Sequence, residues 1–250
     1  MILDVAVIRR SGAALVLAGV MALVSGCATT EFVQVRERPH NPVTDRLKAS
    51  SFGYVRHSKR ADSYLRQAGY RGEGDVKSLL QFCLQQPMTP DNIEGKHALA
   101  EFQYLTAESI RARDPKLAME LYLDAARTSW SYFAAQSNTG VVLNPDDPQH
   151  RSTAEIYNTT TEKLLRLAKT EGRLQLGQSL RMPLTGRRLM FEIPFPSRMM
   201  SMEHFGEFEF VSDYQLKNLT HRHVSSGLGV PIIAIRPATM GRDPLEKYYT

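Results

Sequence analysis

The sequence predicts an α+β fold in which helices come first along the chain and strands follow. Two observations predict it. Apolar residues recur at a helical spacing of three to four residues through most of residues 45–172, and at a spacing of two in residues 173–250. Because the two patterns occupy separate parts of the chain, we expect a helical hairpin or bundle followed by a small antiparallel or mixed β segment, and not an alternating α/β sheet.

Residues 1–26 are typical of a signal peptide. Arg9 and Arg10 precede an apolar run over residues 12–24, which is shorter than the ~20 residues of a comfortable bilayer span. The run ends in LVSGC, which resembles the lipobox of bacterial lipoproteins. That resemblance implies cleavage before Cys27, which becomes the lipidated first residue of the mature protein. The alternatives are an ordinary secretory peptide with a coincidental cysteine, or an uncleaved anchor helix.

In bacterial lipoproteins this cysteine carries a diacylglyceryl group and the new N-terminus is acylated too, so the resemblance implies a durable membrane anchor at Cys27. Residue 28 is Ala and not the Asp that resembles an inner-membrane retention signal. That difference favours the outer membrane. Because Pro, Arg and Thr dominate residues 28–44 without a hydrophobic period, we expect residues 27–44 to be the lipidated cysteine and a flexible tether.

The helical region, residues 45–172, begins with two short helices. They are predicted over SKRADSYLRQAGY and DVKSLLQFCLQQ, the second with Asp75 as its N-cap. Cys83 lies in the second helix among leucines and a phenylalanine, so we expect it to pack as a small buried hydrophobe. A catalytic thiol is disfavoured there, because no basic residue or histidine stands close in sequence to lower its pKa.

A helical hairpin follows over residues 92–134, where the helical period is strongest. Asp114 caps and Pro115 opens its second helix. The apolar stripes comprise Ala98, Phe102, Leu105 and Ser109 on the first helix and Leu117, Leu121, Tyr122 and Ala125 on the second. DPKLAMELYLDAA weakly resembles half of a tetratricopeptide (TPR) repeat, with Ala118, Tyr122 and Ala126 at its small, aromatic and small positions. One period does not make an array, so a hairpin in a small bundle is predicted.

Residues 141–152, VVLNPDDPQHRS, predict a loop because of their prolines and aspartates. The following helix has Ile156, Leu164, Leu165 and Leu167 as its apolar residues and Gly172 near its end. In the β region, one strand face is predicted to carry Leu189, Phe191, Ile193 and Phe195. EFEFVSDYQL predicts a second strand, with Phe208 and Phe210 facing away from Glu207 and Glu209, and GVPIIAIRP predicts a third.

The serines of HVSSGLGVP, Ser225 and Ser226, do not match the G-x-S-x-G elbow of an α/β-hydrolase, because His223 and Val224 stand where glycine is required. A proline-containing apolar strand follows where the elbow needs a helix, and no His-Gly pair is present for an oxyanion loop. Gly227 and Gly229 therefore predict a tight turn with positive φ before a strand.

Other chemistry has little support in the sequence, and we predict no catalytic residue, metal or cofactor. Paired histidines without a diagnostic acidic or cysteine partner favour exposed or hydrogen-bonded side chains over a zinc site; they are His204, His221 and His223. Glu207 and Glu209 suit a solvated strand face better than a glycosidase pair. The methionines at 199, 200 and 202 suit core filling or a soft contact patch. No nucleotide-binding motif is present, and the interspersed charges, net +5, argue against nucleic acid.

IYNTTTEKLLRLA, the β segment, YQLKNLTHRHVSSGLGVPIIAIR and DPLEKYYT together resemble the N-terminal region of bacterial lipid-anchored α/β-hydrolase proteins of the esterase or lipase-like type. GLGVP, residues 227–231, is the most specific part. Because the sequence ends at Thr250 before any catalytic triad, no catalytic residue is carried over. The resemblance implies an envelope lipoprotein that is the non-catalytic accessory or N-terminal domain of a hydrolase-like protein. The alternatives are a self-sufficient lipoprotein that binds or scaffolds a protein partner through the hairpin, and an enzyme whose site is not visible in the sequence.

Overall fold

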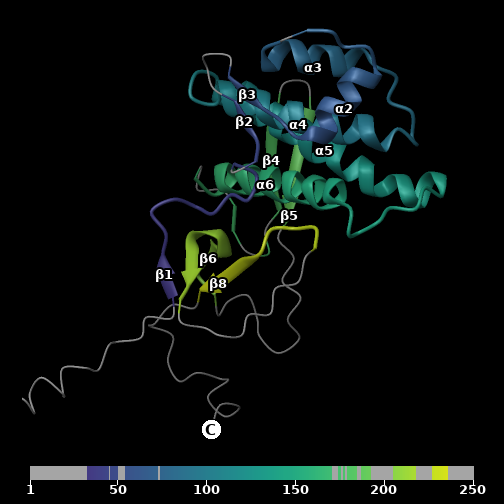
Figure 1. The fold of residues 1–250 in the computed structure, drawn as a ribbon. Helices are drawn as coiled ribbons and strands as arrows, with labels where there is room; N and C mark the ends of the chain where they lie inside the picture. Colours follow the sequence, from purple (N-terminus) through teal and green to yellow (C-terminus); the bar gives the residue numbers. More distant parts are fainter. Residues whose placement is uncertain are drawn as a thin grey trace, which may run out of the picture. The chain divides into compact units, whose positions relative to one another are not determined.

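The computed structural model describes residues 33–44, 46–49, 54–72, 74–170, 174–175, 177, 179–184, 187–192, 205–217 and 227–235. The chain divides into a small unit, Met1–Val35 with Tyr214–His223, and a larger unit, Arg36–Asp213 with Val224–Thr250. The α+β class is confirmed, because helices and antiparallel strand pairs make up the described part of the chain (Figure 1). The predicted order is only partly right, since three short strands, Val33–Val35, Lys48–Ala49 and Val55–Arg56, precede the helices.

Two short helices begin where the sequence places them. Helix α2 (Lys59–Gln67) follows Ser58, whose hydroxyl accepts a hydrogen bond from the Ala61 amide at 3.1 Å. Helix α3 (Val76–Gln85) follows Asp75, whose carboxylate accepts one from the Ser78 amide at 2.9 Å. Each cap satisfies an amide that has no partner within its own helix. Both predicted helices are therefore confirmed.

The predicted hairpin is formed by α4 (Ile93–Ile110) and α5 (Pro115–Thr139). Asp114 caps α5 by accepting the Leu117 amide at 3.0 Å, and Pro115 occupies its first position. Helix α4 does not have the single apolar stripe that was predicted, since 14 of its 18 residues are buried. The reason is that α2, α3, α5, α6 and β2 all pack against it. Helix α4 is thus the central helix of the larger unit (Figure 1).

The buried side of α5 differs slightly from its predicted stripe. Leu117 is 45% exposed, because it lies in the first turn after an exposed connection, and Leu121 is only partly buried. Tyr122 is buried, and its ring lies 6.3 Å from the ring of Tyr104 on α4. The three positions of the repeat-like pattern, Ala118, Tyr122 and Ala126, are all buried. They form the inner side of the hairpin.

Helix α6 (Pro148–Thr170) begins inside the segment that was predicted to be a loop. Asp147 accepts the Gln149 amide at 2.8 Å, and Pro148 takes the first helical position. The aspartate and proline that suggested irregular structure thus start a helix instead. Ile156 and Leu164 are buried as predicted, whereas Leu165 and Leu167 are partly buried and Gly172 lies outside the described residues.

The described strands form antiparallel pairs. The pairs are β1 (Val33–Val35) with β7 (Tyr214–Leu216), β2 (Lys48–Ala49) with β3 (Val55–Arg56), β4 (Ser179–Leu184) with β5 (Arg187–Glu192), and β6 (Glu207–Phe210) with β8 (Ile232–Ile235). β1 therefore lies in the segment that was predicted to be a tether. In the larger unit that segment is also ordered at Val43, which is fully buried and donates its amide to Asn41 Oδ1 at 2.9 Å.

Strand β6 joins the core of the helices. Phe208 and Phe210 are buried there, while Glu207 is exposed and Glu209 partly buried, which confirms the predicted alternation. Two cations of α6 cover the phenylalanines: Lys169 Nζ lies 4.9 Å from the Phe208 ring centre, and the Arg166 guanidinium 4.2 Å from that of Phe210. These contacts fix β6 against α6.

The strand predicted over EFEFVSDYQL is not continuous. A 3₁₀ turn, η2 (Val211–Asp213), separates β6 from β7, and the two strands pair with different partners. Arg166 of α6 donates to both carboxylate oxygens of Asp213, at 2.7 and 3.2 Å, which holds this turn on the helix. Ile193 and Phe195 of the other predicted strand face lie outside the described residues.

Candidate functional site

Most of the candidate residues considered for chemistry or contacts lie outside the described residues. They are Cys27, Met199, Met200, Met202, His204, His221, His223, Ser225 and Ser226. Cys83 is described and is fully buried in α3, as predicted. Burial raises the pKa of its thiol to about 12, and the nearby charge of Glu101 acts in the same direction. A thiol with so high a pKa is a poor nucleophile at neutral pH.

Asn158 of α6 holds the glycine turn that follows the two serines. Its side-chain nitrogen donates to the Gly227 carbonyl at 2.9 Å, and its side-chain oxygen accepts the Gly229 amide at 2.7 Å. Gly229 has φ +136°, as predicted, whereas the φ of Gly227 is not in the left-handed region, contrary to the prediction. The amide of Asn158 therefore fixes the backbone just before β8.

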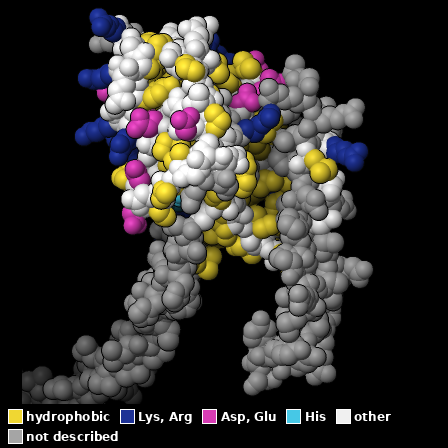
Figure 2. Space-filling model, turned by 90° about the vertical axis from the view of Figure 1, so that its right-hand side faces the viewer, with side chains coloured by type: hydrophobic (Ala, Val, Ile, Leu, Met, Phe, Trp, Pro, Cys, Tyr) yellow, Lys and Arg dark blue, Asp and Glu magenta, His cyan; other side chains and the backbone are white. Residues whose placement is uncertain are grey.

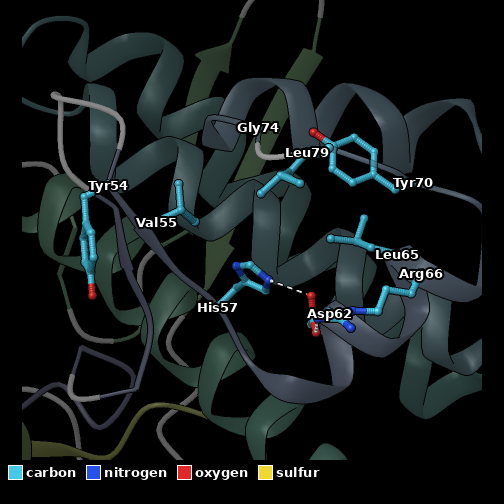
Figure 3. A pocket seen from close by; sticks show the side chains of 10 residues that line it. Tyr54, Val55, His57, Asp62, Leu65, Arg66, Tyr70, Gly74 and Leu79 are labelled. Carbon is cyan, nitrogen blue, oxygen red and sulfur yellow. Dashed lines mark ion pairs between the residues drawn. The ribbon is translucent and has the colours of Figure 1, made fainter.

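A cleft of about 550 Å³ opens beside α2 (Figure 3). It is lined by residues of β3, α2, the loop after α2 and α3. The apolar lining residues include Val55, Leu65 and Leu79, the aromatic ones are Tyr54 and Tyr70, and the polar ones are His57, Asp62 and Arg66. The lining of the cleft thus combines aromatic, apolar and ionisable groups.

Asp62 lies between His57 and Arg66 in this cleft (Figure 3). Its Oδ1 atom is 3.7 Å from His57 Nε2, and its Oδ2 atom is 2.9 Å from Arg66 Nη2. His57 Nδ1 is buried and has no hydrogen-bond partner among the described residues. The imidazole ring is 5.5 Å from the Phe102 ring of α4. Asp62 thus lies on the Nε2 side of the imidazole, and Nδ1 on the other side is buried.

The residue after His57 links the cleft to a buried polar pair on α4. The Ser58 amide donates to Glu101 Oε1 at 2.6 Å. Glu101 and His97, one helical turn apart, are 0% and 1% exposed, and His97 Nε2 is 3.5 Å from Glu101 Oε2. His97 Nδ1 lies 2.9 Å from Thr153 Oγ1 of α6. The pair therefore connects α2, α4 and α6.

The surrounding hydrogen bonds determine where a proton lies in this pair. The Thr153 hydroxyl donates to the Gln149 carbonyl at 2.8 Å, so it accepts a hydrogen bond from His97 Nδ1. A neutral His97 then has a lone pair on Nε2, which faces Glu101 Oε2, and neither atom has another hydrogen-bond partner among the described residues. Two buried lone pairs in contact are unfavourable. A proton on Glu101 Oε2 satisfies both atoms.

Burial shifts both pKa values in the direction that this arrangement requires. Desolvation raises the pKa of Glu101 to about 7, against the lowering effect of its hydrogen bonds from Ser58. Desolvation also lowers the pKa of His97 to about 4, with a further contribution from the charges of Arg46 and Arg60. Between these values both groups are neutral. This pair was not among the predicted site residues, although a histidine and a glutamate four residues apart on one predicted helix were a visible signal.

Comparison with protein-family models, with curated proteins and with solved structures finds no match for this chain. Within the described residues, no helix combines the length and the apolar character needed to cross a membrane. The same residues contain no cluster of three or more His, Cys, Asp or Glu side chains suited to a metal ion.

Proposed function

We propose that the protein is a lipid-anchored lipoprotein of the cell envelope, and that its helical domain is a non-catalytic accessory or N-terminal domain of a hydrolase-like protein. The observation that carries the proposal is the order of features in residues 9–27: two arginines, an apolar run shorter than a bilayer span, and LVSGC. Acyl chains on Cys27 would hold the domain at the membrane surface. The alanine at position 28 favours the outer membrane.

Two observations support a structural role for groups that would otherwise suggest catalysis. Asn158 fixes the turn after Ser225 and Ser226 with two hydrogen bonds, and burial keeps the thiol of Cys83 protonated. We expect replacement of both serines by alanine to leave folding unchanged and to remove no ester hydrolysis. Hydrolysis of short-chain or long-chain esters that disappears in this double variant would instead make the loop an active site.

Metabolic labelling tests the anchor. Cells that produce the wild type, Cys27→Ala or Cys83→Ala are given a clickable fatty acid, and the protein is isolated and its label measured. We expect label on the wild type and on Cys83→Ala and none on Cys27→Ala, because only a thiol forms the thioether-linked lipid. Equal label on Cys27→Ala and the wild type would refute the assignment. Unlabelled wild type that is cleaved and released identifies an ordinary secretory peptide.

A scaffolding role for the hairpin is the second candidate, and Trp130 favours it. This residue, the one tryptophan of the chain, is 54% exposed on α5, with its ring 6.0 Å from that of Tyr157 on α6. Tryptophan is enriched among the residues that dominate protein interfaces. A photo-crosslinking residue at position 130 should capture one recurrent protein in cells, and one at exposed Lys116 should not. Equal capture at both positions would contradict this role.

A further inference from the structure

The positive charge of the chain is concentrated at the start of the larger unit. Residues 36–77 contain ten Lys and Arg and five Asp and Glu, a net charge of +5, which equals the formal net charge of the whole chain. The segment begins nine residues after Cys27, and nine residues extend to at most about 30 Å. An anchor at Cys27 therefore keeps the start of the basic segment within about 30 Å of the anchored residue.

The fold pairs some of these cations with acids, whereas others have no acidic partner among the described residues. Three form ion pairs: Arg46 with Glu155, Arg60 with Asp147, and Arg66 with Asp62. Lys48, Arg56 and Lys59 are exposed and form no ion pair with any described residue. We call these three residues the cationic hairpin: Lys48 and Arg56 belong to the β2 and β3 pair, and Lys59 begins α2. On the face that Figure 2 shows, Lys and Arg side chains lie along one edge and also over the middle of the described part, with Asp and Glu among them.

The cationic hairpin places like charges close together. Lys48 and Arg56 are direct cross-strand partners in the β2 and β3 pair. Like charges in such positions oppose pairing of the strands. Lys59 follows Arg56 by three residues, so it lies within about 11 Å of it. Tyr54, just before β3, is 59% exposed, and its amphipathic ring suits a boundary between water and apolar chains. A facing layer of negative charge would relieve this repulsion.

We propose that the cationic hairpin is a docking surface for the headgroups of anionic phospholipids, which holds the domain against the membrane that carries its anchor. The inference rests on the proposed function, because lipid on Cys27 makes docking intramolecular and keeps the local concentration of headgroups high. Each Lys or Arg at an anionic surface favours the bound state by about fivefold. Three such residues therefore raise the ratio of docked to undocked domain on the order of 100-fold.

Limited trypsin digestion of the full-length protein, purified from producing cells and reconstituted into vesicles, tests the proposal. The vesicles contain phosphatidylcholine alone or mixed with phosphatidylglycerol, and mass spectrometry follows cleavage after Lys48, Arg56 and Lys59. We expect slower cleavage at these sites on the anionic vesicles at low salt, and loss of protection at high salt, because salt screens the attraction. Cleavage after exposed Arg113 and Lys116 should be equal on both vesicles.

A second measurement uses Trp130 as the energy donor to a dansyl lipid in the same vesicles. The Lys48→Glu, Arg56→Glu and Lys59→Glu triple variant should lose the extra transfer seen on anionic vesicles. The matched control, Arg113→Glu, Lys116→Glu and Arg127→Glu, changes the net charge equally at exposed positions and should retain it. Far-UV circular dichroism verifies that both variants are folded, and the salt comparison on the wild type needs no variant.

The outcomes separate this inference from the anchor. Equal protection on neutral and anionic vesicles, or equal loss of energy transfer in both triple variants, overturns the docking surface. Wild type that does not float with phosphatidylcholine vesicles contradicts the anchor, and flotation with phosphatidylglycerol-containing vesicles alone then still supports the docking surface. Short duplex DNA that protects the three sites as well as anionic vesicles do would overturn the assignment to lipid.

Discussion

Glu101→Gln should stabilise the domain at pH 7 and leave its stability unchanged at pH 4.5. Glutamine reproduces the neutral carboxyl that the buried pair requires: its oxygen can accept the Ser58 amide, and its NH₂ group can donate to His97 Nε2. The wild type pays for this arrangement at neutral pH, because Glu101 must take up a proton on folding that it does not carry when unfolded. The variant needs no such proton.

The magnitude follows from the two pKa values. The folded pKa of Glu101, about 7, lies above its ordinary value of 4.5. Its contribution to stability is therefore fully present below pH 4.5 and is lost as pH rises through 7. A difference of this size corresponds to about 3 kcal/mol at about 1.4 kcal/mol per pKa unit. The variant should thus gain up to about 3 kcal/mol relative to the wild type between pH 4.5 and 7.

His97 makes the comparison sharper, because its contribution has the opposite sign. Its folded pKa, about 4, lies below its ordinary value of 6.5, so its stabilising contribution is present above pH 6.5 and is lost as pH falls through 4. In the wild type the two effects offset each other between pH 4.5 and 6.5: the unfolded chain carries a proton on His97, and the folded protein carries one on Glu101. In Glu101→Gln only the effect of His97 remains, so its stability should rise with pH over this range.

Urea unfolding of the two proteins over a series of pH values, followed by far-UV circular dichroism, measures both curves. Glu101→Leu is the matched control of similar volume. It leaves the Ser58 amide and His97 Nε2 without their partner and should lose roughly 2–5 kcal/mol. A Glu101→Gln variant that is less stable than the wild type by several kcal/mol at pH 7 would refute the reasoning, because it would show that the folded protein uses an ionised Glu101 beside a protonated His97.

Three further substitutions test the packing. Leu105→Ala removes a fully buried side chain of α4 and should cost about 2–5 kcal/mol in urea unfolding, whereas exposed Lys116→Ala should change little; equal small effects would show that the core is misplaced. Gly229→Val should lower the melting temperature, since a β-branched residue is strained at φ +136°, and an unchanged melt would contradict the clamped turn. Arg166→Met leaves the partly exposed Asp213 carboxylate without its bidentate partner and should cost about 1 kcal/mol at low salt and less at high salt; a salt-independent loss would indicate packing instead of charge.

The starts of the helices were predictable because their capping bonds are local. Asp75, Asp114 and Asp147 each accept an amide two or three residues further along the chain. The start of α6 was nevertheless predicted wrongly, although Asp147-Pro148 repeats the pattern of Asp114-Pro115. An Asp-Pro pair can end the preceding segment and can also begin a helix. The other prolines and aspartates around residue 147 suggested only an irregular segment, so the helix start was not predicted.

The burial of α4 was not predictable from its periodicity, because its polar residues suggested a solvated face. Lys96, His97, Glu101, Gln103 and Thr106 are all buried. Their hydrogen-bond partners include groups that are distant in sequence: Ser58 is 43 residues from Glu101, and Thr153 is 56 residues from His97. A hydrophobic period reports which residues share one face of a helix. It does not report that another helix covers the opposite face.

The proton on Glu101 also affects the cleft beside α2. The same carboxyl that faces His97 accepts the Ser58 amide through its other oxygen, and Ser58 is both the cap of α2 and the neighbour of His57 in the cleft. A neutral carboxyl makes this link compatible with complete burial, since an ionised one without a countercharge is much more costly there. The placement of α2 on α4, and with it the position of the imidazole of His57 beside Asp62, thus depends on a buried group that lies outside the cleft.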